Sequence, residues 1–280
     1  MEKKYILTDE IREFNGKILH RIQAVRDFGK IRTGDLGGWI EKEGNLSHEG
    51  DCWVYNDAQV YDNARVGANA LVGDDAHVFG NALIYGNAWV YNSAWVYDSA
   101  NIYGNAQIYG NACVYHSAWV YNNAHIYGNA KIYGDAQIHG NAKVYGDAII
   151  CEEMLVSYSK IDTDLRTDIA ASLRGQCNLL LIKNKVIAYK IVNRNLTSLF
   201  DKNFVYKIGE IAEVKNPDKS HTSCASGLHF SNLTYWDDNV QKYKDKTYLV
   251  AEINVEDIIT IQQGKIRCKK AKILDKVDIQ

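Results

Sequence analysis

The sequence lacks the features that mark membrane and secreted proteins. No run of about 18 apolar residues occurs, so no transmembrane helix is expected. The start Met1-Glu2-Lys3-Lys4 leads into mixed charges instead of an apolar stretch, so no signal peptide is expected either. These absences predict a cytoplasmic protein with no membrane partner.

Signals for metal ions, cofactors and nucleic acid are also weak. None of the 6 cysteines forms a Cys-x-x-Cys pair, and zinc ligands usually come in close pairs, so no metal site is predicted. The Gly-rich turn at residues 34–40 lacks the strand-then-helix context of a phosphate loop, and no cofactor is predicted. The formal net charge is −2, so the chain has no excess of positive charge for binding nucleic acid.

What the sequence does contain is a six-residue repeat. Alanine returns every six residues from Ala58 to Ala148, and Val or Ile follows two residues after each one, from Val60 to Ile150. Because side chains alternate along a strand, this small-then-branched pair forms a narrow inner face. The Gly-Asn, Gly-Asp or Asn-Asn pairs that follow tolerate positive φ and form corners. Three units make a triangular coil, and roughly sixteen units predict about five stacked coils.

An aromatic residue usually follows the inner Val or Ile. With three units per coil these residues stack as Tyr91, Tyr109, Tyr127 and Tyr145; as Phe79, Tyr97, Tyr115 and Tyr133; and as Tyr85, Tyr103 and Tyr121 with His139 above. Such ladders can simply stabilise adjacent coils. Alternatively they form contact surfaces, because exposed aromatic patches mark interfaces, and a free face could stack bases or sugars. The predicted interface residues are Tyr91, Tyr97, Tyr109, Tyr115, Tyr127, Tyr133, Trp89, Trp95 and Trp119.

The repeat resembles the hexapeptide-repeat superfamily over about residues 46–150. That superfamily commonly has Gly directly after the aliphatic residue, whereas here Tyr takes this place and Gly follows it. The resemblance implies a left-handed parallel β-helix and a homotrimer of prisms packed side by side through one face.

Most known enzymes of this superfamily are acyltransferases, with a catalytic histidine and usually a protruding loop. The histidine candidates here are His77, His116, His125 and His139, but no loop interrupts residues 54–150. The resemblance therefore implies acyl- or acetyltransferase activity as one alternative, and surface positions for these histidines as the other.

The predicted fold is mainly β, in three domains. Residues 1–45 form a β cap, with strands over 3–7 and 17–25 and with Leu36, Trp39 and Ile40 plugging the open end of the β-helix. Residues 46–151 form the β-helix, and residues 152–280 an α+β domain. In that last domain, helices are expected over 162–174 and 233–243, and strands over 178–183, 186–192, 204–214, 226–230, 247–255 and 265–274.

The C-terminal domain holds the candidate ligand-binding residues Tyr189, Cys224, His229 and Glu252. Cys224, His229 and Glu252 are the residue types of a nucleophile, a base and an orienting group, although the sequence does not show that they meet. Strand alternation places Leu228 and Phe230 on one face and His229 on the other, which also allows a structural role for His229.

The order of segments in this domain is similar to ADP-ribosyltransferase-like folds. Gly227 to Phe230, Leu233 to Tyr243 and the apolar strand that ends at Glu252 follow that order, with Tyr189 near the place of the usual first-strand histidine. This analogy implies a nucleotide- or NAD-related site.

Residues 187–192, 224–230 and 264–269 resemble a C-terminal module of phage and prophage proteins of unknown activity. Residues 26–40, running into the repeat, resemble phage and enterobacterial hexapeptide-repeat proteins assigned as transferases by fold alone. Because fold is not function, we predict a non-enzymatic binding or scaffold protein of phage or prophage origin. Its trimer would present the C-terminal domains to a host protein or a nucleotide-like ligand in the host cytoplasm, with an anti-defence role as one version. The alternatives are an acyl- or acetyltransferase and a nucleotide- or NAD-related site.

Overall fold

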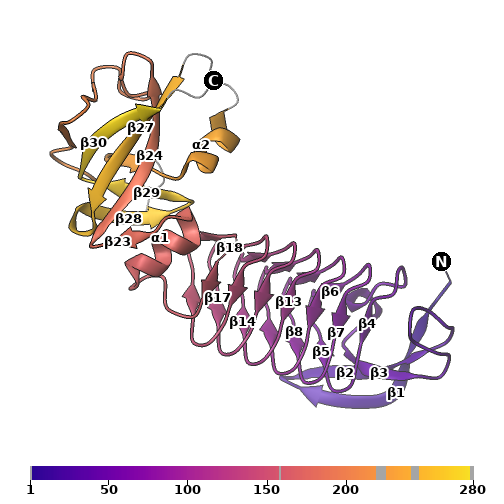
Figure 1. The fold of residues 1–280 in the computed structure, drawn as a ribbon. Helices are drawn as coiled ribbons and strands as arrows, with labels where there is room; N and C mark the ends of the chain where they lie inside the picture. Colours follow the sequence, from indigo (N-terminus) through magenta and orange to yellow (C-terminus); the bar gives the residue numbers. More distant parts are fainter. Residues whose placement is uncertain (1, 158, 219–224, 241–245, 278–280) are drawn as a thin grey trace. The chain divides into compact units, whose positions relative to one another are not determined.

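A computed structural model describes residues 2–157, 159–218, 225–240 and 246–277. The chain divides into two compact units, residues 1–164 and residues 165–280 (Figure 1). The first unit is a β-solenoid with an antiparallel cap, and the second is an α+β unit.

The β-solenoid consists of two-residue strands that recur every six residues. Each strand pairs in parallel with the strand 18 residues later, as Trp89 does with Gln107, and this sorts the strands into three faces. Face one contains β5 (Gln59–Val60), β8 (His77–Val78), β11 (Trp95–Val96), β14 (Cys113–Val114), β17 (Lys131–Ile132) and β20 (Ile149–Ile150). Face two contains β4 (Trp53–Val54), β7 (Leu71–Val72), β10 (Trp89–Val90), β13 (Gln107–Ile108), β16 (His125–Ile126), β19 (Lys143–Val144) and β22 (Lys160–Ile161). Face three contains β6 (Arg65–Val66), β9 (Leu83–Ile84), β12 (Asn101–Ile102), β15 (Trp119–Val120), β18 (Gln137–Ile138) and β21 (Leu155–Val156).

The solenoid has about seven turns, so the predicted count of about five is too low. Both ends continue past the regular repeat, and there the spacing changes. Ile40 pairs with Val60, and Val144 pairs with Ile161, in place of the regular 18-residue step. The sequence count followed the six-residue period and therefore missed these irregular turns.

The interior of the solenoid is as predicted. The alanines from Ala58 to Ala148 are fully buried, and so are the Val and Ile residues that follow them, apart from the nearly buried Val66. At the corners, non-glycine residues such as Asn92 and Asn122 adopt φ values of 54° and 57°. Corner asparagines also bond from turn to turn, from Asn69 through Asn87, Asn105 and Asn123 to Asn141.

The predicted aromatic ladders are present on all three faces. Ring centroids of Tyr91 and Tyr109 lie 4.9 Å apart, and those of Tyr97 and Tyr115 also lie 4.9 Å apart. On the third face, Tyr121 stacks on His139 at 5.0 Å. Rings therefore repeat at nearly the spacing of adjacent strands.

The N-terminal cap extends face one. Strands β1 (Tyr5–Phe14), β2 (Lys17–Ala24) and β3 (Leu36–Ile40) run antiparallel to one another, and β3 then pairs in parallel with β5. A 3-10 turn, η1 (Glu43–Asn45), follows. Ile40 joins the inner row and Trp39 is buried outside it against Leu19 and Tyr61, but Leu36 is 50% exposed. The expectation that Leu36 plugs the solenoid is wrong, because β3 joins face one only from Trp39 onward.

Aromatic residues of the cap pack against the first strand of face two. Tyr5 and Trp53 are fully buried, with ring centroids 6.2 Å apart, and Phe28 packs edge-on against Trp53 at 5.3 Å. The Tyr5 hydroxyl donates to the carbonyl oxygen of Leu46 at 2.8 Å. Trp53 occupies an outward strand position, but the cap covers it.

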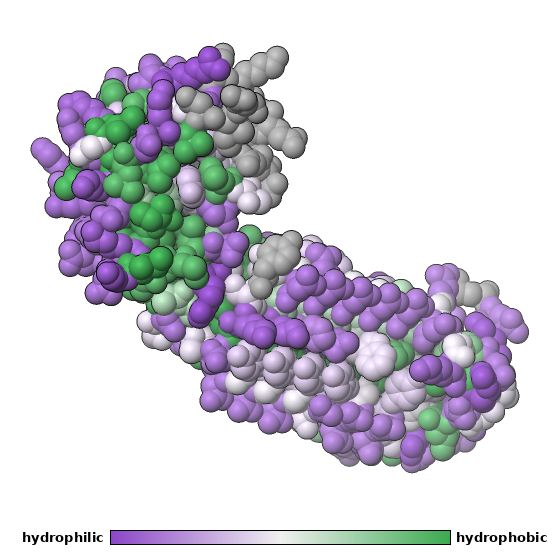
Figure 2. Space-filling view, viewed as in Figure 1, coloured by the Kyte–Doolittle hydropathy of each residue, from purple (hydrophilic) through white to green (hydrophobic). Residues whose placement is uncertain are grey.

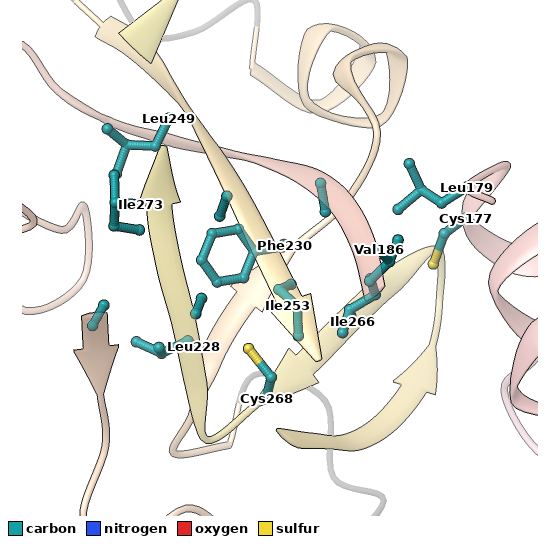
Figure 3. Packing of buried hydrophobic residues seen from close by; sticks show 14 of the residues in the cluster. Cys177, Leu179, Val186, Leu228, Phe230, Leu249, Ile253, Ile266, Cys268 and Ile273 are labelled. Carbon is teal, nitrogen blue, oxygen red and sulfur yellow. The ribbon is translucent and has the colours of Figure 1, made fainter. Parts of the chain in front are cut away.

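The C-terminal unit packs two sheets and its first helix around a main core, and its second helix packs in a separate hydrophobic cluster with Ile191 and Tyr248. A five-stranded antiparallel sheet has the order β23 (Leu181–Ile182), β24 (Lys185–Asn193), β27 (Lys246–Asn254), β30 (Lys270–Val277), β25 (Ile211–Glu213). A three-stranded sheet has the order β26 (Leu228–Phe230), β29 (Lys265–Cys268), β28 (Ile258–Gln262). The two helices are α1 (Ile169–Cys177) and α2 (Leu233–Val240), and a 3-10 turn, η2 (Val255–Asp257), follows β27. Figure 3 shows Phe230 in the middle of the core, surrounded by side chains from both sheets.

The predicted elements of this unit are present in part. Of the strand expected over 204–214 only Ile211–Glu213 forms, and the strand expected over 265–274 is two strands that belong to different sheets. The first helix begins at Ile169, because the Asp168 carboxylate caps it by accepting from the backbone N–H of Ala171 at 2.8 Å. It continues through the expected stop at Gly175 to Asn178, whose left-handed conformation ends it. Strand β28 was not predicted.

Candidate functional site

The C-terminal unit contains a cavity of about 630 Å³, within the size range of ligand sites. It lies among β24, β26, the start of α2 and the segment of residues 198–206. Its wall combines three lysines, one histidine, two carboxylates and several rings: Lys190, Lys215, Lys265, His229, Asp201, Glu213, Phe200, Phe204, Tyr206, Tyr235 and Trp236. We call it the Lys190 cavity.

Lys190 is the unusual group in this wall. Along β24 the buried row is Val186, Ala188, Lys190 and Val192, so the ammonium group enters the core side of the sheet. Lys190 is buried, with only 6% of its surface exposed to solvent. The Nζ atom donates to the carbonyl oxygen of His229 at 3.3 Å. Within the described ranges, no carboxylate forms an ion pair with it.

Burial of Lys190 disfavours its charged form and lowers the pKa of its ammonium to about 8. The rings of Tyr206 and Phe230 lie 5.7 and 5.9 Å from Nζ and offer their π faces as weak partners. At neutral pH most of the molecules therefore carry a buried positive charge beside an open cavity.

His229 faces the same cavity from β26. As predicted from strand alternation, Leu228 and Phe230 are buried on one side, and His229 is half-buried on the other. Burial, followed by the positive charges of Lys190, Lys265 and Arg267, lowers the pKa of the imidazole to about 4. The ring is thus neutral at pH 7 and can exchange hydrogen bonds with a ligand, but it supplies no charge.

Gly227 shapes this corner of the cavity. Its φ is +154°, and a Cβ atom at this position would lie 2.7 Å from Cγ of Arg267. The glycine therefore lets the chain pass close to β29 just before His229.

The aromatic part of the wall is held by two hydrogen-bonded connections. The backbones of Tyr189 and Ser231 exchange N–H···O bonds of 2.7 and 2.9 Å, which bring the end of β26 to β24. The Trp236 indole donates to the carbonyl oxygen of Tyr189 at 2.7 Å, which ties α2 to the same strand. Tyr235 and Trp236 meet edge to face at 5.1 Å. A planar ligand would thus meet aromatic surface that is already in place.

The four residues predicted for this site do not all gather in the cavity. His229 lines it, whereas the side chain of Tyr189 lies on the opposite face of β24 from Lys190. Glu252 pairs across the sheet with Ile187, and its carboxylate accepts from Lys185 Nζ at 2.8 Å. It lines a separate hollow of about 350 Å³. Cys224 lies outside the described residues, so the structure does not assemble the predicted nucleophile, base and orienting group.

Sequence reasoning missed Lys190, Lys265, Tyr206 and Trp236 as site residues. One signal for Lys190 was available, because a lysine occupies a position of a strand whose alternate residues are Val and Ala. The rings of Tyr206 and Trp236 come from separate segments, and no local pattern connects them to Lys190.

The four solenoid histidines occupy packed or corner positions. His77 lies between the rings of Phe14 and Trp95, at 5.0 and 4.6 Å, and burial lowers its pKa. His125 lies in an outward strand slot, where burial lowers its pKa. His116 sits at a corner with φ +56°, and no loop is inserted beside any of these residues.

Two further observations concern the described residues. No group of three or more His, Cys, Asp or Glu side chains among them could hold a metal ion. Of the helices in these ranges, none is long and apolar enough to cross a membrane.

Figure 2 shows hydrophobic residues gathered on the viewed face of the C-terminal unit, whereas polar residues cover most of the viewed solenoid. Several apolar residues of this unit are strongly exposed, among them Phe200 of the cavity wall at 87%. An exposed ring at a cavity mouth fits a ligand-binding surface.

The fold and the repeat define a β-solenoid repeat protein with a C-terminal α+β unit. Residues 58–74, 82–98 and 106–122 match the YdcK β-solenoid repeat, and residues 186–280 match a domain of unknown function (DUF7666). A similar protein is "Uncharacterized acetyltransferase YdcK" of Escherichia coli (strain K12), 38% identical over 61 residues. The match covers 19% of this chain and 19% of that protein. The predicted likeness of the C-terminal unit to phage modules stays a prediction.

Proposed function

We propose that this chain is a binding protein whose C-terminal unit holds a nucleotide-like ligand, a planar ring that carries an anionic group, in the Lys190 cavity. The observation that carries the proposal is the buried Lys190 ammonium, which has no carboxylate partner among the described residues and borders a cavity of about 630 Å³.

The charge requirement follows from the cost of burial. A buried cation without a counter-ion destabilises a fold, and it is tolerated where it gains a partner during function. A phosphate group of a ligand would supply this partner through charge-assisted hydrogen bonds from Nζ. Lys215 and Lys265 add positive charge to the same wall, while Glu213 is already paired with Lys270 at 3.2 Å.

The proposal that the ligand contains a planar ring follows from the aromatic residues in the rest of the cavity wall. Phe204 and Tyr206 lie 4.9 Å apart on one side, and Tyr235 and Trp236 form the other side. A base stacked on such rings gains about 1–3 kcal/mol. The neutral His229 imidazole is placed to exchange a hydrogen bond with the base or with the phosphate.

The test uses the full chain at pH 7, labelled with 5-fluorotryptophan and followed by ¹⁹F NMR. AMP, ADP and NAD serve as probes, and inorganic phosphate controls for anion binding without a base. We expect a nucleotide to shift the Trp236 resonance in the wild type and in Lys185→Met, but not in Lys190→Met. Lys185 is a matched control, because it lies on the same strand but is paired with Glu252 at the surface. No shift with any nucleotide, or an equal shift in Lys190→Met, would overturn the proposal.

We further propose that the solenoid winds as a left-handed β-helix and assembles a homotrimer. Each face presents one exposed tryptophan, Trp89, Trp95 or Trp119, beside its tyrosine ladder. Exposed aromatic residues of this kind are enriched in interfaces. The trimer would then present three copies of the Lys190 cavity.

An acetyltransferase is the second candidate, favoured by the name of the E. coli relative. It requires a site that encloses coenzyme A, and no loop is inserted between the strands of the solenoid from β4 to β20 to do so within one chain. Calorimetry of the full chain with acetyl-coenzyme A tests it directly. Saturable binding would favour this candidate, and absence of heat would remove it.

A further inference from the structure

The tyrosine ladder on face two has a missing ring. Its positions recur every 18 residues and hold Tyr55, Gly73, Tyr91, Tyr109, Tyr127 and Tyr145. From Tyr91 to Tyr145 consecutive rings stack with centroids 4.9 to 5.2 Å apart. Gly73 therefore leaves the position between Tyr55 and Tyr91 without a side chain.

The space at Gly73 is open. A Cβ atom built there would meet only Cβ of Tyr55 within 4 Å, at an ordinary contact distance of 3.7 Å. Gly67, the other glycine in a ladder position, differs, because its added Cβ would lie 2.5 Å from the ring of Tyr85. On face three the neighbouring ring already fills the gap, whereas on face two nothing does.

This gap belongs to a cavity of about 440 Å³ in the solenoid unit. Leu71 forms part of its wall, and the cap segment Gly29–Ile31 borders it. Trp89, which is 47% exposed, stands edge-on to Tyr91 at 6.3 Å and forms a side wall. Four polar side chains complete the lining: Asp51, Asn56, Asn69 and Asp74.

We propose that this cavity, the Gly73 slot, binds the base of an uncharged nucleoside as a substitute ring between Tyr55 and Tyr91. Two steps along a ladder with strand spacing of about 4.8 Å place these two tyrosines about 10 Å apart, which leaves room for one flat ring. A saturated sugar ring is thicker than an aromatic ring and fits such a slot less well. Aromatic rings prefer offset-stacked partners at this separation.

The polar lining selects against phosphate and in favour of amino groups. The carboxylates of Asp51 and Asp74 repel an anion and accept hydrogen bonds from exocyclic N–H donors. Lys30 is the one cationic residue of this lining, and it is exposed. The slot therefore differs from the Lys190 cavity, which has an excess of lysine, and its ligand lacks the phosphate.

The test adds the missing ring. Gly73→Tyr completes the ladder and fills the slot, whereas Gly73→Ala adds one methyl group in open space, without a positive φ. Adenosine and cytidine at millimolar concentration serve as probes of the full chain, and the ¹⁹F resonance of 5-fluoro-Trp89 reports binding, assigned by Trp89→Phe. We expect the shift in the wild type and in Gly73→Ala, at least tenfold weaker binding in Tyr91→Leu, and no binding in Gly73→Tyr.

Three outcomes would overturn the proposal. They are no response of Trp89 to either nucleoside, equal responses in wild type and Gly73→Tyr, and a change of oligomeric mass in Gly73→Tyr without any nucleoside effect. The last result would assign the gap to contact between chains. Failure here leaves the Lys190 cavity untouched, because Gly73 and Lys190 belong to separate units and each has its own fluorine reporter.

Discussion

Replacement of Lys190 by methionine should stabilise the protein while abolishing its ligand binding. The pKa of Lys190 falls from an ordinary value of 10.5 to about 8 in the folded chain. This difference corresponds to about 3 kcal/mol that the fold loses by burying the charge. Methionine has a similar length and no charge, but it gives up the hydrogen bond to His229, worth about 1 kcal/mol. We therefore expect a net gain of about 2 kcal/mol at pH 7.

The stability difference between Lys190→Met and the wild type should depend on pH, because the pKa of Lys190 is lower in the folded chain than in the unfolded chain. Below pH 8 both the folded and the unfolded chain carry the proton on Lys190, so the destabilisation is complete. Between pH 8 and 10.5 the unfolded chain binds more protons than the folded chain, and stability rises with pH. The advantage of Lys190→Met over the wild type should therefore shrink through this range and turn into a deficit of about 1 kcal/mol above it, because the hydrogen bond to His229 is still missing.

The assay is urea unfolding of the full chain, with the ¹⁹F resonance of Trp236 as the reporter of the C-terminal unit. Lys185→Met is the control, and the loss of its surface ion pair should change the free energy of unfolding by less than about 1 kcal/mol. A loss of stability in Lys190→Met at pH 7, or an advantage that is the same at pH 7 and above pH 10.5, would refute the reasoning.

Three further outcomes are expected. Gly128→Ala should cost at least about 1 kcal/mol in urea unfolding, because its φ is +71° and its Cβ would lie 2.8 Å from the backbone nitrogen of Gly146. Gly44→Ala, with open space around it, should cost nothing, and equal losses in the two variants would contradict the corner geometry. Light scattering at micromolar concentration should give the mass of a trimer. Of the alanine variants of Trp89, Trp95 and Trp119, the one on the interface face should have a lower mass. A wild-type monomer would exclude the assembly. Nucleotide affinity should weaken as pH rises through about 8, where free Lys190 loses its proton, and a flat profile from pH 7 to 9 would argue against Lys190 as the anion partner.

The interior of the solenoid could be predicted in full, because its information is local and repeated. Alternation within each strand and the six-residue period place every inner Ala, Val and Ile, as Ala88 and Val90 illustrate. The turns at the two ends of the solenoid could not be counted from the sequence, because strand pairing there departs from the regular 18-residue step, as in the pairing of Val144 with Ile161. The packing of Tyr5 against Trp53 likewise depends on how the cap folds back over the first turn.

The Lys190 cavity could be predicted only in part. Alternation placed His229 correctly, because Leu228 and Phe230 beside it are apolar. Lys190 and Trp236 join it through tertiary hydrogen bonds, such as the bond from Trp236 to the Tyr189 carbonyl, which no sequence spacing encodes. Glu252 illustrates the converse, because a carboxylate on an apolar strand belongs here to a surface pair with Lys185.

The most direct test of the central claim is a calorimetric titration of the full chain with the nucleotide that shifts Trp236. Binding to the wild type and to Lys185→Met with equal affinity, together with loss of measurable binding in Lys190→Met, is the predicted result. Equal affinity in all three proteins would contradict the assignment of the Lys190 cavity as the ligand site.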